Sequence, residues 1–416
     1  MLSGRNLHGR GLHLSGIPRQ DRTVAKVNPV IYLHVPFCGS FCTYCDFYSE
    51  ICRSSQAFND YADAVIGEIN SRQKELSMNI SAPNAVNTLY IGGGTPSVLP
   101  LDVLARIVRA IALSEAPFEE FTVEVNPEDI VEKGSEYVRG LLAIGVNRIS
   151  MGVQSFDDGI LRWMNRRHDG TRAIKAYRIL RECGVRNISI DLIFGISQLT
   201  DEIWKDTIEE ALALAPEHIS AYQLSIEEGS ALAKMVSDGR YVEASDEQCR
   251  RQYNFLCCTL KQSGYHHYEI SNFAKPGFEA VHNSAYWRRV PYIGLGPGAH
   301  SLIGNVRSWN SQELPHRALN CEPLSDAPLK LSRNQDNLTT YSRSFETLST
   351  EDIRVEKIML SLRTDKGMEA TELYSLAERY AVDSLLMEGA LEKIGSRIRI
   401  SESHLFVSDE IIRELI

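Results

Sequence analysis

The sequence predicts an α/β protein whose main unit is a partial (β/α)6 barrel, followed by a small C-terminal domain of helical, winged-helix-like form. Two observations carry this prediction. Short β-branched runs alternate six times with amphipathic helical patterns, which is typical of a parallel sheet with helical crossovers. The unusual polar residues follow these runs at one end, and the carboxyl ends of barrel strands are where chemistry takes place.

The six expected strands share an apolar, β-branched composition and span 30–35, 87–91, 120–125, 147–153, 187–193 and 218–224. The expected helices between them span 59–76, 101–113, 134–144, 171–182 and 201–214. In the first helix, Tyr61, Val65 and Ile69 recur every four residues and form one apolar stripe. We therefore assign 29–301 to the barrel, including an extension after its sixth strand.

Polar and glycine residues stand at or near the ends of these strands. A cysteine loop follows the first strand, and a glycine turn at 92–96 (GGGTP) follows the second. The later strands contribute Glu124, Asn126, Gln154, Asp191, Gln223 and Ser225. Because the ends of parallel strands meet at one face, we expect a site at the carboxyl mouth of the barrel.

The cysteine loop contains Cys38, Cys42 and Cys45 in the spacing C-x3-C-x2-C, with no fourth cysteine close enough to complete a local set. A [4Fe–4S] cluster usually takes four thiolates, so three ligands leave one iron open to a cofactor or substrate. Two alternatives remain open. Tetrahedral zinc would need a fourth ligand, for which His34 is the nearest candidate. A redox disulfide would need only Cys42 and Cys45.

Composition favours a cytoplasmic protein. The nine cysteines are an odd number in a chain of 416 residues, which argues against a secreted disulfide scaffold. The net charge of −10 argues against a nucleic-acid partner, because polyanions select basic surfaces. Residues 1–28 are basic by contrast; we expect a disordered leader or an early start codon there, with a targeting peptide as the alternative.

At this point the chain resembles the radical S-adenosylmethionine (SAM) family that contains the oxygen-independent coproporphyrinogen III oxidases and a heme chaperone (HemW) subgroup. Collinear matches lie at 35–38, 92–96, 122–127, 147–156, 190–195, 268–273, 282–287 and 294–300. The resemblance implies that Cys38, Cys42 and Cys45 ligate a [4Fe–4S] cluster, whose open iron binds SAM. It assigns SAM contacts to Tyr32, Tyr44, Gly93, Gly94, Thr95, Glu124, Gln154, Arg166 and Asp191.

Each assignment has a structural alternative. The glycines could form a plain tight turn, Glu124 could be a charge on the solvated rim, and Arg166 could belong to a solvated helix face with Arg162 and Arg167. Asp191 lies in an apolar strand, where a carboxylate without a partner would be costly, so a role in the site is the simpler explanation.

The subgroup depends on other residues. The oxidases of the family resemble one another in a further cysteine two places after the third ligand and in a longer N-terminal arm. This chain has Phe47 at that place, and only 37 residues precede the first ligand, Cys38. The segment HNSAYW at 282–287 is similar to the heme chaperones. His282 could ligate heme iron, Tyr286 and Trp287 could stack on the macrocycle, and His300 is a second ligand candidate. The alternative is that His282 only forms hydrogen bonds inside the fold.

We interpret the chain after the barrel as a polar connector at 302–350 and a small domain at 351–416. We expect helices near 351–362, 369–380 and 384–394, then a hairpin of 397–400 with 404–407 and a final helix. This order suggests a winged helix, but 14 acidic against 9 basic residues in 351–416 disfavour a DNA duplex. We interpret the domain as a lid or docking piece.

Three functions follow from these observations. The first is a heme chaperone that carries heme as cargo to apo-hemoproteins, with the respiratory chain as candidate recipient and an electron donor as a further partner. The second is a coproporphyrinogen III oxidase, and the third is an enzyme acting on RNA, which the acidic charge disfavours. Peripheral membrane contact stays open, no catalytic residue is assigned, and oxidase activity is not expected.

Overall fold

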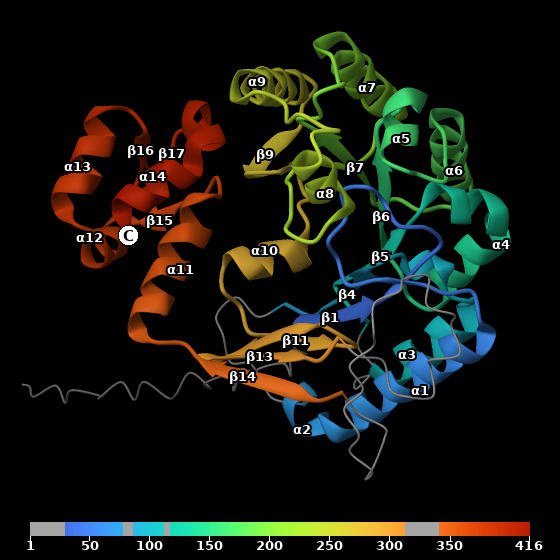
Figure 1. Cartoon of the computed structure of the whole chain (residues 1–416). Coiled ribbons are helices and arrows are strands. Elements are labelled where there is room, and N and C mark those ends of the chain that lie inside the picture. Colours follow the sequence, from blue (N-terminus) through green and yellow to red (C-terminus); the bar gives the residue numbers. More distant parts are fainter. Residues whose placement is uncertain (1–29, 78–85, 112–116, 313–340) are drawn as a thin grey trace, which may run out of the picture.

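The structure is a computed structural model that describes residues 30–77, 86–111, 117–312 and 341–416. Its core is one sheet with the strand order β14-β13-β12-β11-β1-β4-β5-β6-β7-β8-β10-β9 (Figure 1). The expected basic leader lies outside the described residues. No helix in the described part is long and apolar enough to cross a membrane.

Six consecutive strands of this sheet are parallel and form the predicted partial barrel. They are β1 (Val30–Val35), β4 (Thr88–Gly93), β5 (Glu120–Val125), β6 (Arg148–Gln154), β7 (Ile188–Phe194) and β8 (His218–Gln223). Each differs from its predicted range by at most two residues at either end. The agreement is close because parallel strands covered on both faces read as continuous apolar runs.

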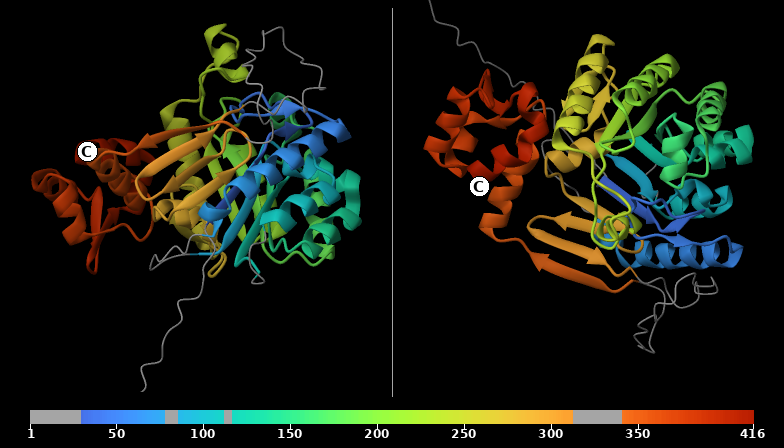
Figure 2. Two further views of the ribbon diagram at one scale, coloured as in Figure 1. Left: turned by 90° about the horizontal axis from the view of Figure 1, so that it is seen from below. Right: turned by 45° about the horizontal axis from the view of Figure 1, so that its top comes forward.

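The outer layer consists of helices that follow the strands (Figure 2). They are α1 (Ser55–Ser71), α2 (Gln73–Leu76), α3 (Leu101–Ile111), α4 (Pro127–Ala143), α5 (Asp158–Trp163), α6 (Gly170–Glu182), α7 (Asp201–Leu214), α8 (Ala231–Ser237) and α9 (Asp246–Gln262). Local sequence fixes where several begin. Asn126, Asp169 and Thr200 each accept a hydrogen bond from a backbone N–H of the first turn, and Pro127 occupies the position where a missing N–H costs nothing.

The sheet continues beyond the six strands on both sides. On one side lie β10 (Asn272–Ala274) and β9 (His266–Glu269), and on the other β11 (Tyr292–Leu295), β12 (His300–Ile303), β13 (Val306–Asn310) and β14 (Arg343–Thr347). The short helix α10 (Val281–Trp287) lies between the two sides in Figure 1. The short strands β2 (Phe37–Cys38) and β3 (Glu50–Ile51) frame the cysteine loop, and a 3-10 turn at Pro96–Val98 follows β4.

The expected connector at 302–350 differs from this structure in its described part. Strands β13 and β14 lie inside that range and pair antiparallel at the edge of the barrel sheet. The sequence did not predict these two strands, because an edge strand needs few apolar side chains and their composition is polar. Residues 313–340 lie outside the described residues.

The C-terminal domain contains α11 (Thr350–Leu362), β15 (Met368–Glu369), α12 (Ala370–Leu376), α13 (Arg379–Met387), β16 (Leu391–Ile394), β17 (Arg397–Ile400) and α14 (Ser408–Leu415). The hairpin is β16–β17, so the expected helix at 384–394 ends early and its last residues form a strand. The expected second hairpin strand at 404–407 is part of a 3-10 turn, Glu402–Val407. Three helices before a hairpin is nevertheless the predicted order.

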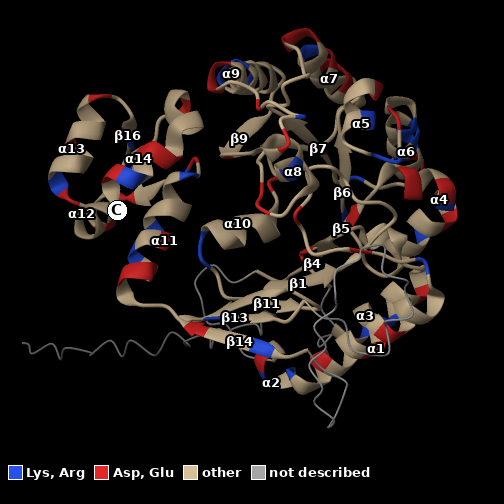
Figure 3. Ribbon diagram, viewed as in Figure 1, with Lys and Arg blue, Asp and Glu red and all other residues tan. Residues whose placement is uncertain are grey.

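Charges are mixed over the outer surface. Lys and Arg alternate with Asp and Glu along the helices rather than gathering into one stripe in the view of Figure 3.

Inside the protein, one buried cation joins the barrel to its edge extension. The Arg72 side chain, 3% exposed, donates to the Glu68 carboxylate at 2.7 Å, to the Gly294 carbonyl at 2.6 Å and to Ser301 Oγ at 3.1 Å. It therefore joins the end of α1 to β11 and β12.

We predict that Arg72→Met lowers the free energy of unfolding by about 3–5 kcal/mol, because the buried Glu68 carboxylate loses its counter-charge. Urea unfolding followed by circular dichroism measures the loss. The control is Arg106→Met: Arg106 pairs with Asp63 at the surface, with 35% and 65% of the two side chains exposed, so its loss stays below about 1 kcal/mol. Equal losses in the two variants would contradict the role given to Arg72.

Candidate functional site

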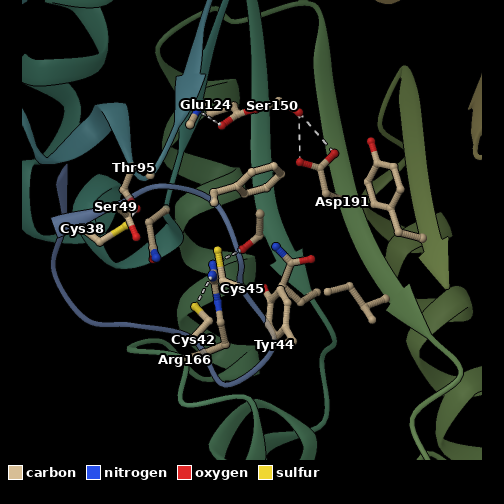
Figure 4. Close-up of a pocket in the computed structure, with 18 of the residues that line it drawn as sticks. Cys38, Cys42, Tyr44, Cys45, Ser49, Thr95, Glu124, Ser150, Arg166 and Asp191 are labelled. Carbon is tan, nitrogen blue, oxygen red and sulfur yellow. Dashed lines mark hydrogen bonds between the residues drawn. The ribbon is translucent and has the colours of Figure 1, made fainter. Parts of the chain in front are cut away.

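The carboxyl ends of the parallel strands open into a cavity of about 410 Å³ (Figure 4). All three cysteines of the loop line it. Of the nine predicted SAM contacts, eight line it as well: Tyr44, Gly93, Gly94, Thr95, Glu124, Gln154, Arg166 and Asp191. Tyr32 does not; its hydroxyl contacts His34 Nδ1 at 3.0 Å inside the barrel wall. The sequence therefore located the cavity, and the SAM contact of Tyr32 stays a prediction.

The end of α5 and the turn after it hold the cysteine loop by hydrogen bonds. Thr43 N donates to the Met164 carbonyl at 3.1 Å, and Thr43 Oγ1 donates to the Trp163 carbonyl at 2.9 Å. Asn165 Nδ2 donates to the Phe41 carbonyl at 2.7 Å. These bonds fix an irregular loop whose backbone would otherwise lack partners. They hold the cysteines against the carboxyl end of β6.

The sulfur atoms have donors beside them. Arg166 Nη1 donates to Cys42 Sγ at 3.3 Å, and Thr95 Oγ1 lies 3.6 Å from Cys38 Sγ (Figure 4). A positive charge and hydrogen bonds stabilise a thiolate, the form that binds iron. Burial raises the pKa of Cys45 to about 11, so that this thiol keeps its proton until a metal replaces it. The donor set fits a thiolate-ligated cluster.

Both alternatives to a cluster lose support. The ring nitrogens of His34 are taken, Nδ1 by the Tyr32 hydroxyl and Nε2 by the Tyr48 carbonyl at 2.9 Å, so His34 is not placed as a zinc ligand. Cys42 and Cys45 are both free thiols. In the described part of the chain, no three His, Cys, Asp or Glu side chains are grouped to hold a single metal ion.

The glycine turn at 92–96 packs directly against β1 and β2, the strands that lead into the cysteine loop. Gly94 N donates to the Val35 carbonyl at 2.8 Å, and Thr95 N donates to the Phe37 carbonyl at 2.7 Å. A Cβ on Gly94 would lie 2.8 Å from the Phe37 oxygen and 3.0 Å from Cys38 Sγ. Glycine is required here for this close approach. A contact of the turn with SAM stays a prediction.

Glu124 is built into the wall rather than solvated at the rim. It accepts hydrogen bonds from the Tyr90 hydroxyl at 2.7 Å and from Gly93 N at 3.1 Å. Burial raises the pKa of Glu124 to about 7, against the opposing effect of the Tyr90 hydrogen bond. A cationic or hydroxyl-bearing ligand would restore the charge of this carboxylate.

Asp191 and Arg166 are also partnered. The Ser150 hydroxyl donates to Asp191 at 3.0 Å, and burial raises the pKa of Asp191. Arg166 Nη2 donates to the Gly152 carbonyl at 2.6 Å, so Arg166 joins β6 to the cysteine loop and is not part of a solvated helix face. Its Nε is buried and has no hydrogen-bond partner among the described residues. Gln154 ends β6 with a φ of +69°, which turns the chain at the cavity.

The proposed heme residues do not meet at this cavity. His282 is 1% exposed; its Nδ1 lies 2.8 Å from Thr88 Oγ1, and its Nε2 lies 3.0 Å from the Tyr286 hydroxyl. The expectation that His282 ligates iron is therefore wrong for this conformation, since both ring nitrogens are used. Tyr286 serves that hydrogen bond, and Trp287 is half-buried at the end of α10. His300 is exposed on β12, and its ring stacks on Trp309 with 5.8 Å between centroids.

Sequence reasoning missed several residues that line the cavity, namely Tyr90, Arg148, Ser150, Tyr222 and Asn283. Four of them occupy inward positions of barrel strands. The signal was present on β6, where Arg148, Ser150 and Gly152 alternate with apolar residues. Alternation within an otherwise apolar parallel strand marks an interior that is polar.

Comparisons with known proteins agree with this geometry. The model of the radical SAM superfamily matches residues 32–211. The heme chaperone HemW of Lactococcus lactis is 34% identical over 81% of this chain and 82% of that protein. HemW of Mycobacterium tuberculosis is 30% identical over 93% and 94%. The solved coproporphyrinogen III oxidase HemN of Escherichia coli shares the fold, with a TM-score of 0.72, 22% identity, and 94% and 90% coverage.

A radical SAM domain carries a [4Fe–4S] cluster and SAM, and when both are bound the reduced cluster would supply one electron to the sulfonium of SAM. In this chain Cys38, Cys42 and Cys45 would hold the cluster. The cavity wall of Glu124, Gln154 and Asp191 would hold SAM beside it.

We predict that Cys38→Ala, Cys42→Ala and Cys45→Ala each abolish the cluster chromophore after anaerobic reconstitution, because two thiolates do not retain it. Iron and sulfide content together with absorbance measure the loss. The exposed Cys258 gives the control, since Cys258→Ala leaves the content unchanged. Full cluster in the Cys42 variant, or stoichiometric zinc, would refute the assignment.

A second prediction concerns SAM. SAM is expected to change the electron paramagnetic resonance signal of the reduced cluster. In Glu124→Gln, the SAM concentration needed for half of this change rises by roughly tenfold to a hundredfold, because a charged acceptor is lost. Glu119→Gln, an exposed carboxylate just before the same strand, is the matched control. Substituting Gly94 would not be informative, because a side chain there reaches Cys38. An unchanged response in Glu124→Gln would leave this carboxylate a structural role only.

Proposed function

The chain belongs to the HemW family of radical SAM proteins, and from this membership we propose that it is a heme chaperone that binds heme and transfers it to apo-hemoproteins. The observation that carries the proposal is the 34% identity to a heme chaperone over 81% of the chain. The cavity, with three free thiols and a polar wall, supports the cofactor part of this function.

The cavity mouth supports a carrier rather than an oxidase. Phe47 and Phe41 both line the cavity, with 65% and 47% of their surfaces exposed. Abstraction of a hydrogen atom by a radical needs a substrate shielded from water and other hydrogen donors. Two exposed aromatic rings instead offer apolar area to a flat ligand that must later leave. Phe47 also stands at the position where the resemblance places a further cysteine in the oxidases.

For the axial ligand we propose His300. Its side chain is exposed, and the parallel indole of Trp309 at 20° supports its ring from one side. Burial and the charge of Arg307 lower the pKa of His300, so the imidazole is neutral and able to bind iron. In the described part of the chain, no side chain competes for its ring nitrogens by hydrogen bonding.

The remaining partners follow from the same proposal. Reduced thiols at the cluster favour a cytoplasmic location, where glutathione keeps cysteines reduced. The recipients would include apo-hemoproteins of the respiratory chain, and an electron donor would reduce the cluster. Peripheral contact with the membrane would bring the carrier to such recipients.

We predict that the reconstituted protein binds heme but forms no protoporphyrinogen IX from coproporphyrinogen III, with or without SAM and reductant. His300→Ala should weaken heme binding roughly tenfold or change the heme absorption spectrum, because the axial bond is lost. His266→Ala, which removes another exposed histidine, is the control. Product formation that depends on Cys38 and SAM would overturn the chaperone proposal and restore the oxidase, whereas wild-type heme binding by His300→Ala would only move the ligand elsewhere.

A further inference from the structure

The floor of the cavity contains a buried cation that the proposed function does not use. Arg148 is the first residue of β6, its side chain is 1% exposed, and it lines the cavity. Its Nε and Nη1 are buried without a hydrogen-bond partner among the described residues. A guanidinium has five N–H donors and no acceptor, so this site is rich in unused donors.

Arg148 has two buried nitrogens without a partner among the described residues, whereas the other buried arginine, Arg72, has none. Arg72 is 3% exposed, and both of its terminal nitrogens donate to carboxylate, carbonyl or hydroxyl oxygens. Arg72 faces packed helices and strands, whereas Arg148 faces the cavity. Leaving a buried donor unpaired is unfavourable, and more so for a charged group. A structural counter-ion would be expected to show contacts like those of Arg72.

The carboxylates near Arg148 are already occupied. Glu120 accepts hydrogen bonds from the backbone N–H of Val281 at 2.8 Å and of His282 at 2.9 Å, which fixes the start of α10. Asp191 accepts from two serine hydroxyls, Ser150 and Ser189. Arg148 makes no ion pair with either of them in the described structure. Their charges keep the guanidinium ionised without satisfying its donors.

Further polar side chains line the cavity. Tyr222 projects from β8 and Asn283 from α10, and both line the cavity together with Arg148. A carboxylate is the anion whose two oxygens match a guanidinium fork. From the unpaired donors and the cavity position, we infer that Arg148 binds a carboxylate of a ligand other than SAM that enters the cavity. Because this inference rests on the proposed heme function, a heme propionate is one source and a free small carboxylate is the other.

The experiment compares heme with its dimethyl ester, in which both propionates are neutral. Each is titrated into anaerobic, reconstituted full-length protein and followed by absorbance. In the wild type, we expect heme to bind at least tenfold tighter than the ester. In Arg148→Gln this ratio should fall close to one, whereas Arg162→Gln, which alters an exposed arginine on α5, should keep the wild-type ratio.

Arg148→Lys covers the case in which the glutamine variant does not fold, since it keeps the buried charge but loses the fork; the ratio should then fall only in part. The wild-type ratio is a test by itself and needs no variant. Saturation-transfer nuclear magnetic resonance with sodium propionate as probe covers the other source. If heme and ester bind equally while propionate binds and Arg148→Lys weakens that binding, the result would support the same site for a small carboxylate.

Three results separate failure of the inference from failure of the proposed function. If heme and ester bind equally to the wild type and propionate does not bind, Arg148 is only a counter-ion and the inference is overturned, while heme binding stands. If the ratio exceeds tenfold but is the same in both Arg148 variants, the propionates bind elsewhere and the inference is again overturned. If neither heme nor ester binds, the proposed function fails, and propionate binding alone decides the inference.

Discussion

The site depends on the close approach of the glycine turn to β1 and β2, the strands that lead into the cysteine loop. Gly94 and Thr95 donate backbone hydrogen bonds to the Val35 and Phe37 carbonyls, and these bonds leave no room for a side chain at Gly94. The same turn directs Gly93 N to the Glu124 carboxylate. One backbone arrangement thus fixes a cysteine and a cavity carboxylate together, so the geometry of the cluster and that of the cofactor wall are not independent.

The polar barrel interior follows from a second constraint, that buried polar groups need partners. Tyr90 satisfies Glu124, Ser150 satisfies Asp191, and Arg166 joins the Gly152 carbonyl to Cys42. Register makes these pairs possible, since β5 places Glu124 beside Ser150 and β6 places Gly152 beside Asp191. Among the residues that line the cavity in the described structure, Arg148 and Arg166 keep buried nitrogens without a hydrogen-bond partner.

The sequence predicted what periodicity encodes and missed what depends on contacts. The six parallel strands were found because burial on both faces makes them apolar, and the site was found because strand ends converge. Strands β13 and β14 were missed because an edge needs few apolar residues, and β16 was read as the end of a helix because four residues carry little periodicity. His282 was misjudged because composition does not reveal whether imidazole nitrogens are already bonded.

The two arginines of the cavity divide it chemically. Arg166 lies at the cysteine loop, bonded to Cys42, and Arg148 lies at the opposite, amino-terminal end of β6. SAM carries both an ammonium and a carboxylate, and we propose that it lies on the cluster side, where Arg166 and Glu124 line the cavity. An additional anion would therefore be drawn to the floor, away from the cluster. A ligand with an apolar ring and flexible carboxylate arms matches that division, because the exposed rings of Phe41 and Phe47 stand at the mouth and the unused cation stands inside.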